Sequence, residues 1–393
     1  MTKRNALMMV GVMAMSVGAA CDAYAQTNVT IYGIVDAAIV YSNNQGGKSN
    51  IYERSGNLAS SRLGFKGNED LGGGLSALFV LENGFNVDDG SLGAANTLFN
   101  RQSYAGLNSR VYGSVTVGRQ YTPYHLFVGP VGPTSSLTGA TGAHPGDVDG
   151  LDTTIRINNS LTYTSPDFGG AQVSAQFGFG ETAGSTRTGN ALSLGLRYDI
   201  NDLKFALGYL KLKNAANLGA GWNSTAAGSF STSVINKGYL SAESVQFIAG
   251  GARYKIGQLE LGVNASNVQY EPGLGSLFSN TATFNTGGVL ATYQLTQALF
   301  VSGGYSYTRE KEANGITDPA KYQQLALEQT YSLSKRTALY ALEAYQYAKG
   351  KTLGAAGGTS QVNAVAVVGD SQNGTPSGGR NQTVLMAGIR HSF

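Results

Sequence analysis

Cysteine is almost absent from this sequence: the 393 residues contain one, Cys21, close to the N-terminus. We expect Cys21 to be lost with an N-terminal leader, so the mature chain has no cysteine although it is exported to an oxidising compartment. Disulfide bonds are therefore excluded as the source of its stability.

Residues 1–25 have the features of a secretory signal peptide. Two basic residues precede an apolar run (6–20), and Ala23-Tyr24-Ala25 follows as a small-residue cleavage site. The run is shorter than the ~20 apolar residues of a membrane helix. A lipoprotein signal would use Cys21, but Gly18 stands where such signals usually carry leucine. We predict a mature protein that begins near Gln26.

Charge is also scarce. Charged residues make up 13% of the sequence, against ~25% in a typical soluble domain. Without the leader, the chain has 27 − 2 = 25 basic and 24 − 1 = 23 acidic residues, a net charge of +2. This balance predicts neither nucleic-acid binding nor a polybasic membrane patch.

Long apolar runs are missing from the mature part, whereas Gly (55), Tyr (22) and Phe (15) are abundant. An exported chain with few charges, many aromatic residues and no helical span is expected to meet lipid through strands. Strands can do so only in a closed barrel, because an open edge would leave backbone groups unpaired in hydrocarbon.

Period-two alternation supports this fold class. In Asn28–Tyr41, alternate residues from Val29 to Ile39 are apolar or glycine, and Thr30, Tyr32 and Asp36 fall on the other face. The C-terminal run has the same pattern: alternate residues from Leu385 to Phe393 fall on one face, which places Phe393 on the lipid side. Both segments are predicted to be wall strands of a transmembrane barrel.

Short and long connections alternate along the chain. The short ones are Asp70–Gly74, Asn108–Tyr112, Pro166–Gly170, Asp199–Asp202, Ile256–Gln258, Leu295–Ala298 and Leu333–Arg336. The long ones are Ser42–Asn57, Asn86–Asn100, Gln120–Ile155, Gly180–Gly189, Asn214–Ser244, Glu271–Ala282, Glu310–Ala320 and Gly350–Asn381. This asymmetry is typical of an all-β, antiparallel outer-membrane barrel, here with about 16 strands, with periplasmic turns and external loops.

The longest of these connections, 120–155, also has a distinctive composition. It contains four of the eight prolines, two of the three histidines, three aspartates and no basic residue. Loops of this length inside a compact domain are usually functional or disordered. We expect it to fold into the lumen and narrow it, with its aspartates facing arginines on the wall.

Several stretches resemble the trimeric general porins of Gram-negative bacteria, and within them the betaproteobacterial type. The stretches are NVTIYGIVDAAIVY (28–41), SRLGFKGNEDLGGGLSALFVLENGF (61–85), NRQSYAGLNS (100–109), YGSVTVGRQYTPYH (112–125), NNSLTYTSPDFGG (158–170), LSKRTALYA (333–341) and the closing GIRHSF. They cover nearly the whole mature chain, so one porin domain is expected over 26–393.

The resemblance implies a homotrimer of sixteen-stranded barrels whose third external loop, 120–155, is a constriction. It also implies contact with outer-membrane lipid and lipopolysaccharide, and assembly by the barrel-assembly machinery, for which the terminal Phe393 is the signal. The Pro-Glu-Phe-Gly turn that many porins carry in the third loop is missing here. Its acidic role would fall to Asp147, Asp149 and Asp152.

Parity predicts which basic residues line the lumen. Leu63 and Phe65 are lipid-facing candidates, so Arg62 and Lys66 should point inward. The same argument turns Arg156 inward, because Leu161 and Tyr163 point out. Arg101 is expected inward on the parity of Ser103, and the resemblance places the basic wall cluster at Arg62, Arg101 and Arg156. The alternative is that these arginines pair with loop acids for structure alone.

Arg119 shares parity with Val115 and Val117, which predicts an outward side chain. A charge exposed to lipid is costly. We therefore expect Arg119 at a subunit interface, where it would meet Asp88 or Asp89 of a neighbouring second loop.

The function predicted is passive diffusion of small hydrophilic solutes and ions through a water-filled channel, with a preference for anions. A substrate-specific channel and an adhesin or receptor acting through its external loops remain alternatives. A barrel enzyme is disfavoured because no serine, histidine and acid can be assembled into a triad. The three histidines lack metal-ligand spacing, and the isolated G-x-G-x-x-A at 178–183 is followed by no βαβ pattern, so no cofactor is expected.

Overall fold

The computed structural model describes residues 28–152, 155–214, 233–358, 360–370 and 376–393. The predicted signal peptide, 1–25, lies outside these residues, as do residues 215–232 of the predicted long connection Asn214–Ser244. Within the described part of the chain, none of the helices has the length and apolar character needed to cross a membrane.

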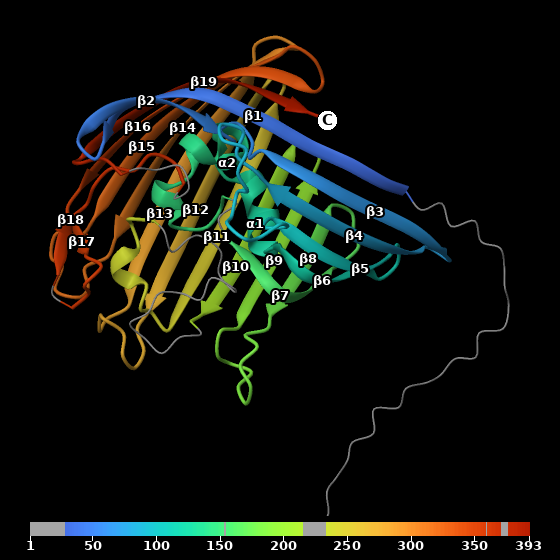
Figure 1. Cartoon of the computed structure of the whole chain (residues 1–393), viewed down its shortest axis with the longest axis horizontal. Helices are drawn as coiled ribbons and strands as arrows, with labels where there is room; N and C mark the ends of the chain where they lie inside the picture. Colours follow the sequence, from blue (N-terminus) through green and yellow to red (C-terminus); the bar gives the residue numbers. More distant parts are fainter. Residues whose placement is uncertain (1–27, 153–154, 215–232, 359, 371–375) are drawn as a thin grey trace, which may run out of the picture.

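The described strands form a closed antiparallel barrel with sixteen positions in its wall (Figure 1). The wall is built from β1 (Asn28–Gln45), β2 (Lys48–Ser55), β3 (Arg62–Gly72), β4 (Leu75–Gly84), β5 (Gln102–Ser109), β6 (Gly113–Tyr121), β7 (Arg156–Thr164), β8 (Ala171–Gly178), β9 (Ala191–Ile200), β10 (Leu203–Lys213), β11 (Ser244–Ile256), β12 (Leu259–Glu271), β13 (Ala282–Gln294), β14 (Leu299–Glu310), β15 (Lys321–Ser332), β16 (Thr337–Lys349) and β19 (Asn381–Ser392). Pairing of β1 with β19 closes the ring.

Strands β2 and β3 share one position in the wall. The first half of β1 pairs with β3 and its second half with β2. The prediction of a long loop over Ser42–Asn57 is therefore wrong: β1 and β2 continue as a hairpin that turns at Gly46 and Gly47, both with positive φ. Alternation weakens in this polar stretch, which hid the strand from the sequence pattern.

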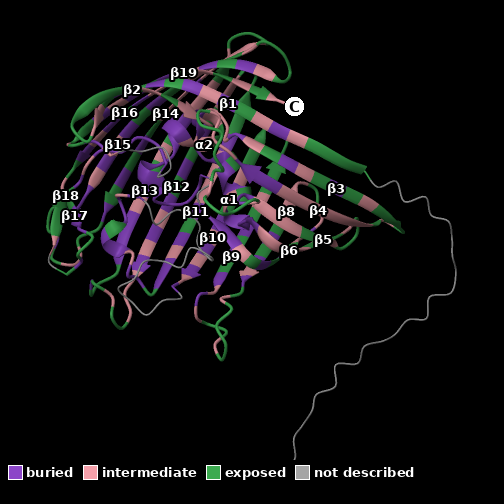
Figure 2. Cartoon of the chain, in the orientation of Figure 1, coloured by how far each residue is buried: buried purple, intermediate pink, exposed green. Residues whose placement is uncertain are grey.

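The alternation of side chains along each strand defines two faces. On β1, Val29, Ile31 and Ile39 are exposed, whereas Asp36 and Val40 are buried. The exposed apolar face is the outward one, and the buried face points into the barrel (Figure 2). This is the dyad pattern of a wall that contacts lipid on one side.

The two ends of the barrel differ as predicted. All seven short connections join consecutive strands at one end, the same end at which β1 begins and β19 ends. The longer connections lie at the other end. The last of them, 350–380, carries the small hairpin of β17 (Lys351–Leu353) and β18 (Gln361–Asn363).

The third loop (122–155) folds against the inward face of the wall. It contains α1 (Pro123–Val128), η1 (Gly129–Val131), α2 (Thr134–Leu137), η2 (Thr138–Gly142) and η3 (Pro145–Asp147). Contacts run from α1 on β9 and β10, through η1 on β11 and β12, to α2 and η2 on β14, β15 and β16. Figure 1 shows α1 and α2 in front of the wall strands, on the concave side.

The prediction that 350–381 is an external loop needs a correction. Part of the last loop is buried, namely residue 364 and residues 366–370. Its backbone bonds to the third loop, from Gly146 N to Gly369 O and from Asp370 N to Gly139 O, each at 3.0 Å. Small residues in the segment NAVAVVGD permit this close approach, and the lumen therefore holds two loop segments.

Candidate functional site

Helix α1 sets the course of the third loop. Thr122 caps it by accepting a hydrogen bond from His125 N at 3.1 Å, and Pro123 occupies the first turn, where a missing N–H costs nothing. Tyr124 N donates to Ser193 Oγ of β9 at 3.0 Å. The sequence Gly129-Pro130 ends the helix and turns the chain along the wall.

On β11, which adjoins β10 in the wall, Arg253 holds the next part of the loop. Its Nη2 donates to Gly132 O at 2.6 Å, and its Nη1 donates to Ser136 Oγ at 2.6 Å and to Glu260 at 2.8 Å. Arg253 thus links the third loop to two strands. Sequence reasoning did not single out Arg253. Alternation could have placed it on the inward face, because its neighbour Tyr254 falls on the outward face.

A basic cluster stands where the loop leaves the wall. Arg101 Nε donates to Glu82 Oε1 at 2.8 Å, with both side chains buried. Arg156 Nη2 donates to the Tyr121 hydroxyl at 3.2 Å. Both guanidinium groups also contact the Tyr121 ring, with centroid distances of 5.9 Å to Arg101 and 4.9 Å to Arg156. Cation–π contact lets two like charges share this small space.

Arg62 and Lys66 continue the cluster along β3. The Arg62 Nε donates to Ser60 O at 3.0 Å, and Lys66 Nζ lies 5.4 Å from the centroid of the Tyr32 ring. Tyr32 OH in turn donates to Glu82 Oε2 at 3.0 Å. Glu82 thus joins both parts of the cluster.

Arg101 reaches the cluster by a different route from the one predicted. Its supposed partner in parity, Ser103, lies on the outward face with Leu107, which is 49% exposed. Arg101 precedes β5, and its backbone N–H bonds to Glu82 O at 3.2 Å. The chain has not yet entered the strand alternation at this point, and the side chain turns inward.

Arg119 does not follow its predicted outward parity. The β6–β7 register shifts between Gly118 and Gln120, and Gly118 has a φ of 132°. This bulge turns Arg119 toward Asn100, whose carbonyl accepts from Nε at 2.8 Å, and toward the Asn158 side chain. A bulge re-aims a side chain in this way without any signal in a period-two pattern.

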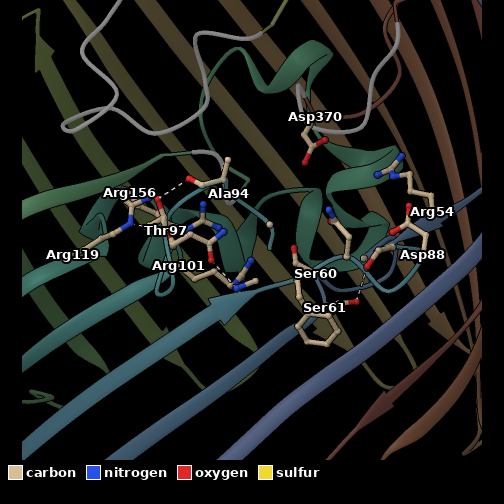
Figure 3. A pocket seen from close by; sticks show the side chains of 18 of the residues that line it. Arg54, Ser60, Ser61, Asp88, Ala94, Thr97, Arg101, Arg119, Arg156 and Asp370 are labelled. Atoms are coloured by element: carbon tan, nitrogen blue, oxygen red, sulfur yellow. Dashed lines mark hydrogen bonds between the residues drawn. The ribbon is translucent and has the colours of Figure 1, made fainter. Parts of the chain in front are cut away.

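Arg101, Arg119 and Arg156 line one cavity of about 770 Å³ (Figure 3). Arg54 of β2 and Asp370 of the last loop line it too, as does Asp88 of the second loop. Arg101 Nη2 and Arg156 Nε have no hydrogen-bond partner among the residues that the structure describes. Both nitrogens are buried, so the positive charge of the two side chains acts on the cavity from within its wall.

The third-loop aspartates are held largely by the loop itself. Asp149 contacts His144 Nδ1 at 2.6 Å and accepts from Ser266 Oγ of β12 at 2.6 Å. Burial alone would raise the pKa of Asp149, but His144 and these hydrogen bonds hold that pKa below its ordinary value. Asp147 accepts from Asp152 N at 3.0 Å. The structure thus gives Asp147 and Asp149 partners outside the arginine cluster.

Asp152 lies closer to the cluster and to the last loop. Its charge acts on Arg101, and its side chain is hydrogen-bonded to that of Asp370. Burial first, and then the neighbouring Asp152, raise the pKa of Asp370 well above its ordinary value, against the effect of Arg54. The neighbouring carboxyl group thus disfavours the charged form of Asp370.

Sequence reasoning missed Glu82 and Asp36. Glu82 shares its parity with Leu78 and Val80, so the pattern did not mark its face as inward. Asp36 is fully buried and accepts from the N–H groups of Asn57, Leu58 and Ala59 and from Tyr340 OH at 2.7 Å. It fixes the chain between β2 and β3.

The remaining predicted residues have simple surroundings. Asp89 is exposed and accepts from Ser91 N at 2.8 Å. Phe393 exchanges two backbone hydrogen bonds with Gly33, each 3.1 Å, and its ring covers the space where a Gly33 side chain would be. The last residue of the chain thus completes the closure of the wall.

A closed barrel with an apolar outward face, a polar cavity within and a loop crossing its interior defines a membrane channel. The chain belongs to the Gram-negative porin family, because residues 11–353 match the sequence model of that family. It is an outer-membrane protein that forms a water-filled channel for small solutes.

Its relatives agree with this assignment. The chain is 30% identical to outer membrane porin protein 32 of Delftia acidovorans over 94% of this chain and 95% of the relative. It is 30% identical to an outer membrane porin protein of Bordetella pertussis over 84% of this chain and 92% of the relative. The structure of an anion-selective porin from Comamonas acidovorans matches with a TM-score of 0.70 and 25% identity, covering 94% of this chain and 100% of that chain.

Proposed function

We propose that this porin is a general diffusion channel that prefers anions. The observation that carries the proposal is the convergence of Arg101, Arg119 and Arg156 on one cavity, while Asp147 and Asp149 are bonded elsewhere. Such an excess of positive charge at low dielectric raises the local concentration of anions. The similar Comamonas acidovorans protein, described as anion-selective, supports the same preference.

Transport through this site is passive and uses no catalytic residue. A solute entering from the loop end passes the third loop and meets the guanidinium groups of Arg62, Arg101 and Arg156. These groups replace part of the hydration of an anion, whereas they repel a cation. Asp152 and Asp370 form the acidic side, and the raised pKa of Asp370 keeps the negative charge of this side small.

Reversal of charge at the cluster tests the proposal. In planar bilayers under a salt gradient, Arg62→Glu/Arg156→Glu should move the zero-current potential toward that of a cation-selective channel. Lys335→Glu/Arg336→Glu is the matched control, because it makes the same charge change in an exposed short turn. An unchanged potential in the cluster variant, with normal conductance, would rule out these residues as the filter.

Assembly as a homotrimer belongs to the same proposal. Glu343 lies on the outward face of β16, directly opposite Leu327 and Leu385, which are both exposed. A carboxylate on a lipid-facing wall is costly, which favours a neighbouring subunit on this face. Contacts with lipopolysaccharide and with the barrel-assembly machinery through Phe393 complete the set of proposed partners.

The interface proposed for Arg119, Asp88 and Asp89 gains little support. Arg119 and Asp88 line the cavity of their own subunit. A substrate-specific channel would need a row of aromatic side chains along the lumen. The exposed tyrosines on the strands, such as Tyr305, Tyr307 and Tyr345, do not support one, because they lie on the outward face.

A further inference from the structure

The second loop brings apolar groups to the arginine cavity. Three of the residues that border this space of about 770 Å³ form an apolar strip that belongs to that loop, namely Phe85, Ala94 and Ala95. Figure 3 shows Ala94 beside Arg156. The cavity therefore offers a solute an apolar surface as well as positive charge.

Backbone contacts hold the apolar strip next to the cluster. The N–H of Gly84, directly before Phe85, donates to Asn100 Oδ1 at 2.7 Å. A Cβ built on Gly84 would lie 3.2 Å from Arg101 Cδ, so the chain passes close to the guanidinium stem. Gly93 N donates to Gly84 O at 2.7 Å, which folds the loop back over the end of β4. The strip thus has a defined place beside the arginines.

Most polar side chains around the cavity already have partners. Hydrogen bonds within the protein engage the side chains of Ser55, Ser61, Asn86, Thr97, Asn100 and Asn158. A polyhydroxylated anion, such as a sugar acid, needs free donors and acceptors that replace its bonds to water. Engaged side chains offer few of them. Recognition in this cavity therefore depends mainly on positive charge and on the apolar strip.

We propose that this cavity favours aromatic carboxylates over hydrophilic anions of the same charge. The inference rests on the proposed function, because it assigns a class of solute to the same anion-preferring cavity. The arginines attract the carboxylate, while the ring of the solute packs against Phe85 and the two alanines. A guanidinium group can also stack on an aromatic face. A space of about 770 Å³ is of the size that holds small organic molecules in proteins.

The test uses the full-length folded protein in planar bilayers at alkaline pH, where the carboxylates stay ionised. The probes are benzoate, gluconate and the neutral benzyl alcohol, each added to a chloride solution. Benzoate should halve the chloride current at a lower concentration than gluconate, and benzyl alcohol should leave the current unchanged.

Two variants of the apolar strip sharpen the test. Phe85→Gln should raise the half-blocking concentration of benzoate about threefold, because one aromatic pair contributes a factor of this order. Ala95→Ser should raise it less, and it keeps an exposed loop position small. Leu98→Gln is the matched control, since this apolar residue of the same loop is 62% exposed and lies outside the lining of the cavity.

Equal half-blocking concentrations of benzoate and gluconate, or no block by benzoate, would overturn the proposal. A lower value for gluconate would assign the cavity to hydroxylated solutes, and a block by benzyl alcohol would remove the role of charge; each would also overturn it. So would an unchanged benzoate value in both strip variants. The zero-current potential of the wild type in a chloride gradient measures the anion preference by itself, so the two proposals can fail separately.

Discussion

Gly195 of β9 and Gly208 of β10 lie directly opposite each other in the barrel wall, and helix α1 rests on both. A Cβ on Gly195 would lie 2.8 Å from Phe127 and from Pro123 O, and one on Gly208 would lie 2.8 Å from Tyr124 and Val128. The absence of side chains at this pair lets the third loop approach the wall. The width of the channel thus depends on two residues that have no side chain.

Gly208→Val should displace α1 from the wall. The added atoms have no space, and overpacking of this kind costs about 1–3 kcal/mol. We expect a lower melting temperature and a single-channel conductance that differs from wild type and fluctuates more. Gly287→Val is the control, because a Cβ at that outward position meets no atom within 4 Å. Wild-type conductance in Gly208→Val would show that the packing of α1 on Gly208 does not set the width of the channel.

Glu82→Gln should increase the preference for anions. The change removes a buried negative charge 2.8 Å from Arg101, while the amide oxygen can still accept from the guanidinium. The zero-current potential in a salt gradient should move further toward the anion limit, with the fold retained. A shift toward cations would contradict the assignment of Glu82 to the conducting cluster.

Asp370→Asn should abolish a pH dependence in the contact between the third and last loops. Because the folded pKa of Asp370 is raised, its contribution to this contact is complete below the ordinary value of 3.8 and is lost as pH rises through the folded pKa. Asp152, Arg54 and Asp147 are the charged groups that act on it.

The measurement is hydrogen exchange at the amides of residues 146 and 370, corrected for the intrinsic rate. Protection in the wild type should fall as pH rises through the raised pKa of Asp370, whereas the Asn variant should keep constant protection. Parallel curves for the two proteins would contradict the raised pKa of Asp370.

Arg119→Ala separates two roles for this residue. From its position beside Asn100 and Asn158 we expect a weaker anion preference and an unchanged melting temperature of the trimer in detergent. Asp89→Ala, on the exposed part of the second loop, provides a comparison. A lower trimer melting temperature in Arg119→Ala, with selectivity intact, would instead support the subunit interface.

The sequence predicted the wall better than the lumen. Alternation and turn residues depend on nearest neighbours, so the barrel, its short turns and the inward side of Arg62 and Arg156 followed from local pattern. Arg119 was placed on the wrong face because the β6–β7 register shifts beside it, next to the positive-φ Gly118, and period-two alternation does not register such an irregularity.

The charge partners were harder to predict for a different reason. Asp149 bonds to Ser266 and Arg253 to Gly132, and each pair joins the third loop to a strand more than 100 residues away in the sequence. Such pairs depend on where the third loop packs against the wall, and this position depends in turn on Gly195 and Gly208. Composition located the acids in the loop, but their partners are a property of long-range packing.

The pairing of Gly33 with Phe393 has a consequence for biogenesis. The two residues are 393 − 33 = 360 positions apart, and their hydrogen bonds close the ring. The first strand must therefore wait, unpaired along one edge, until the last residue has been exported. An exposed edge is prone to pair with other chains, so chains cut short before residue 393 are expected to be cleared or to aggregate rather than to accumulate as leaky pores.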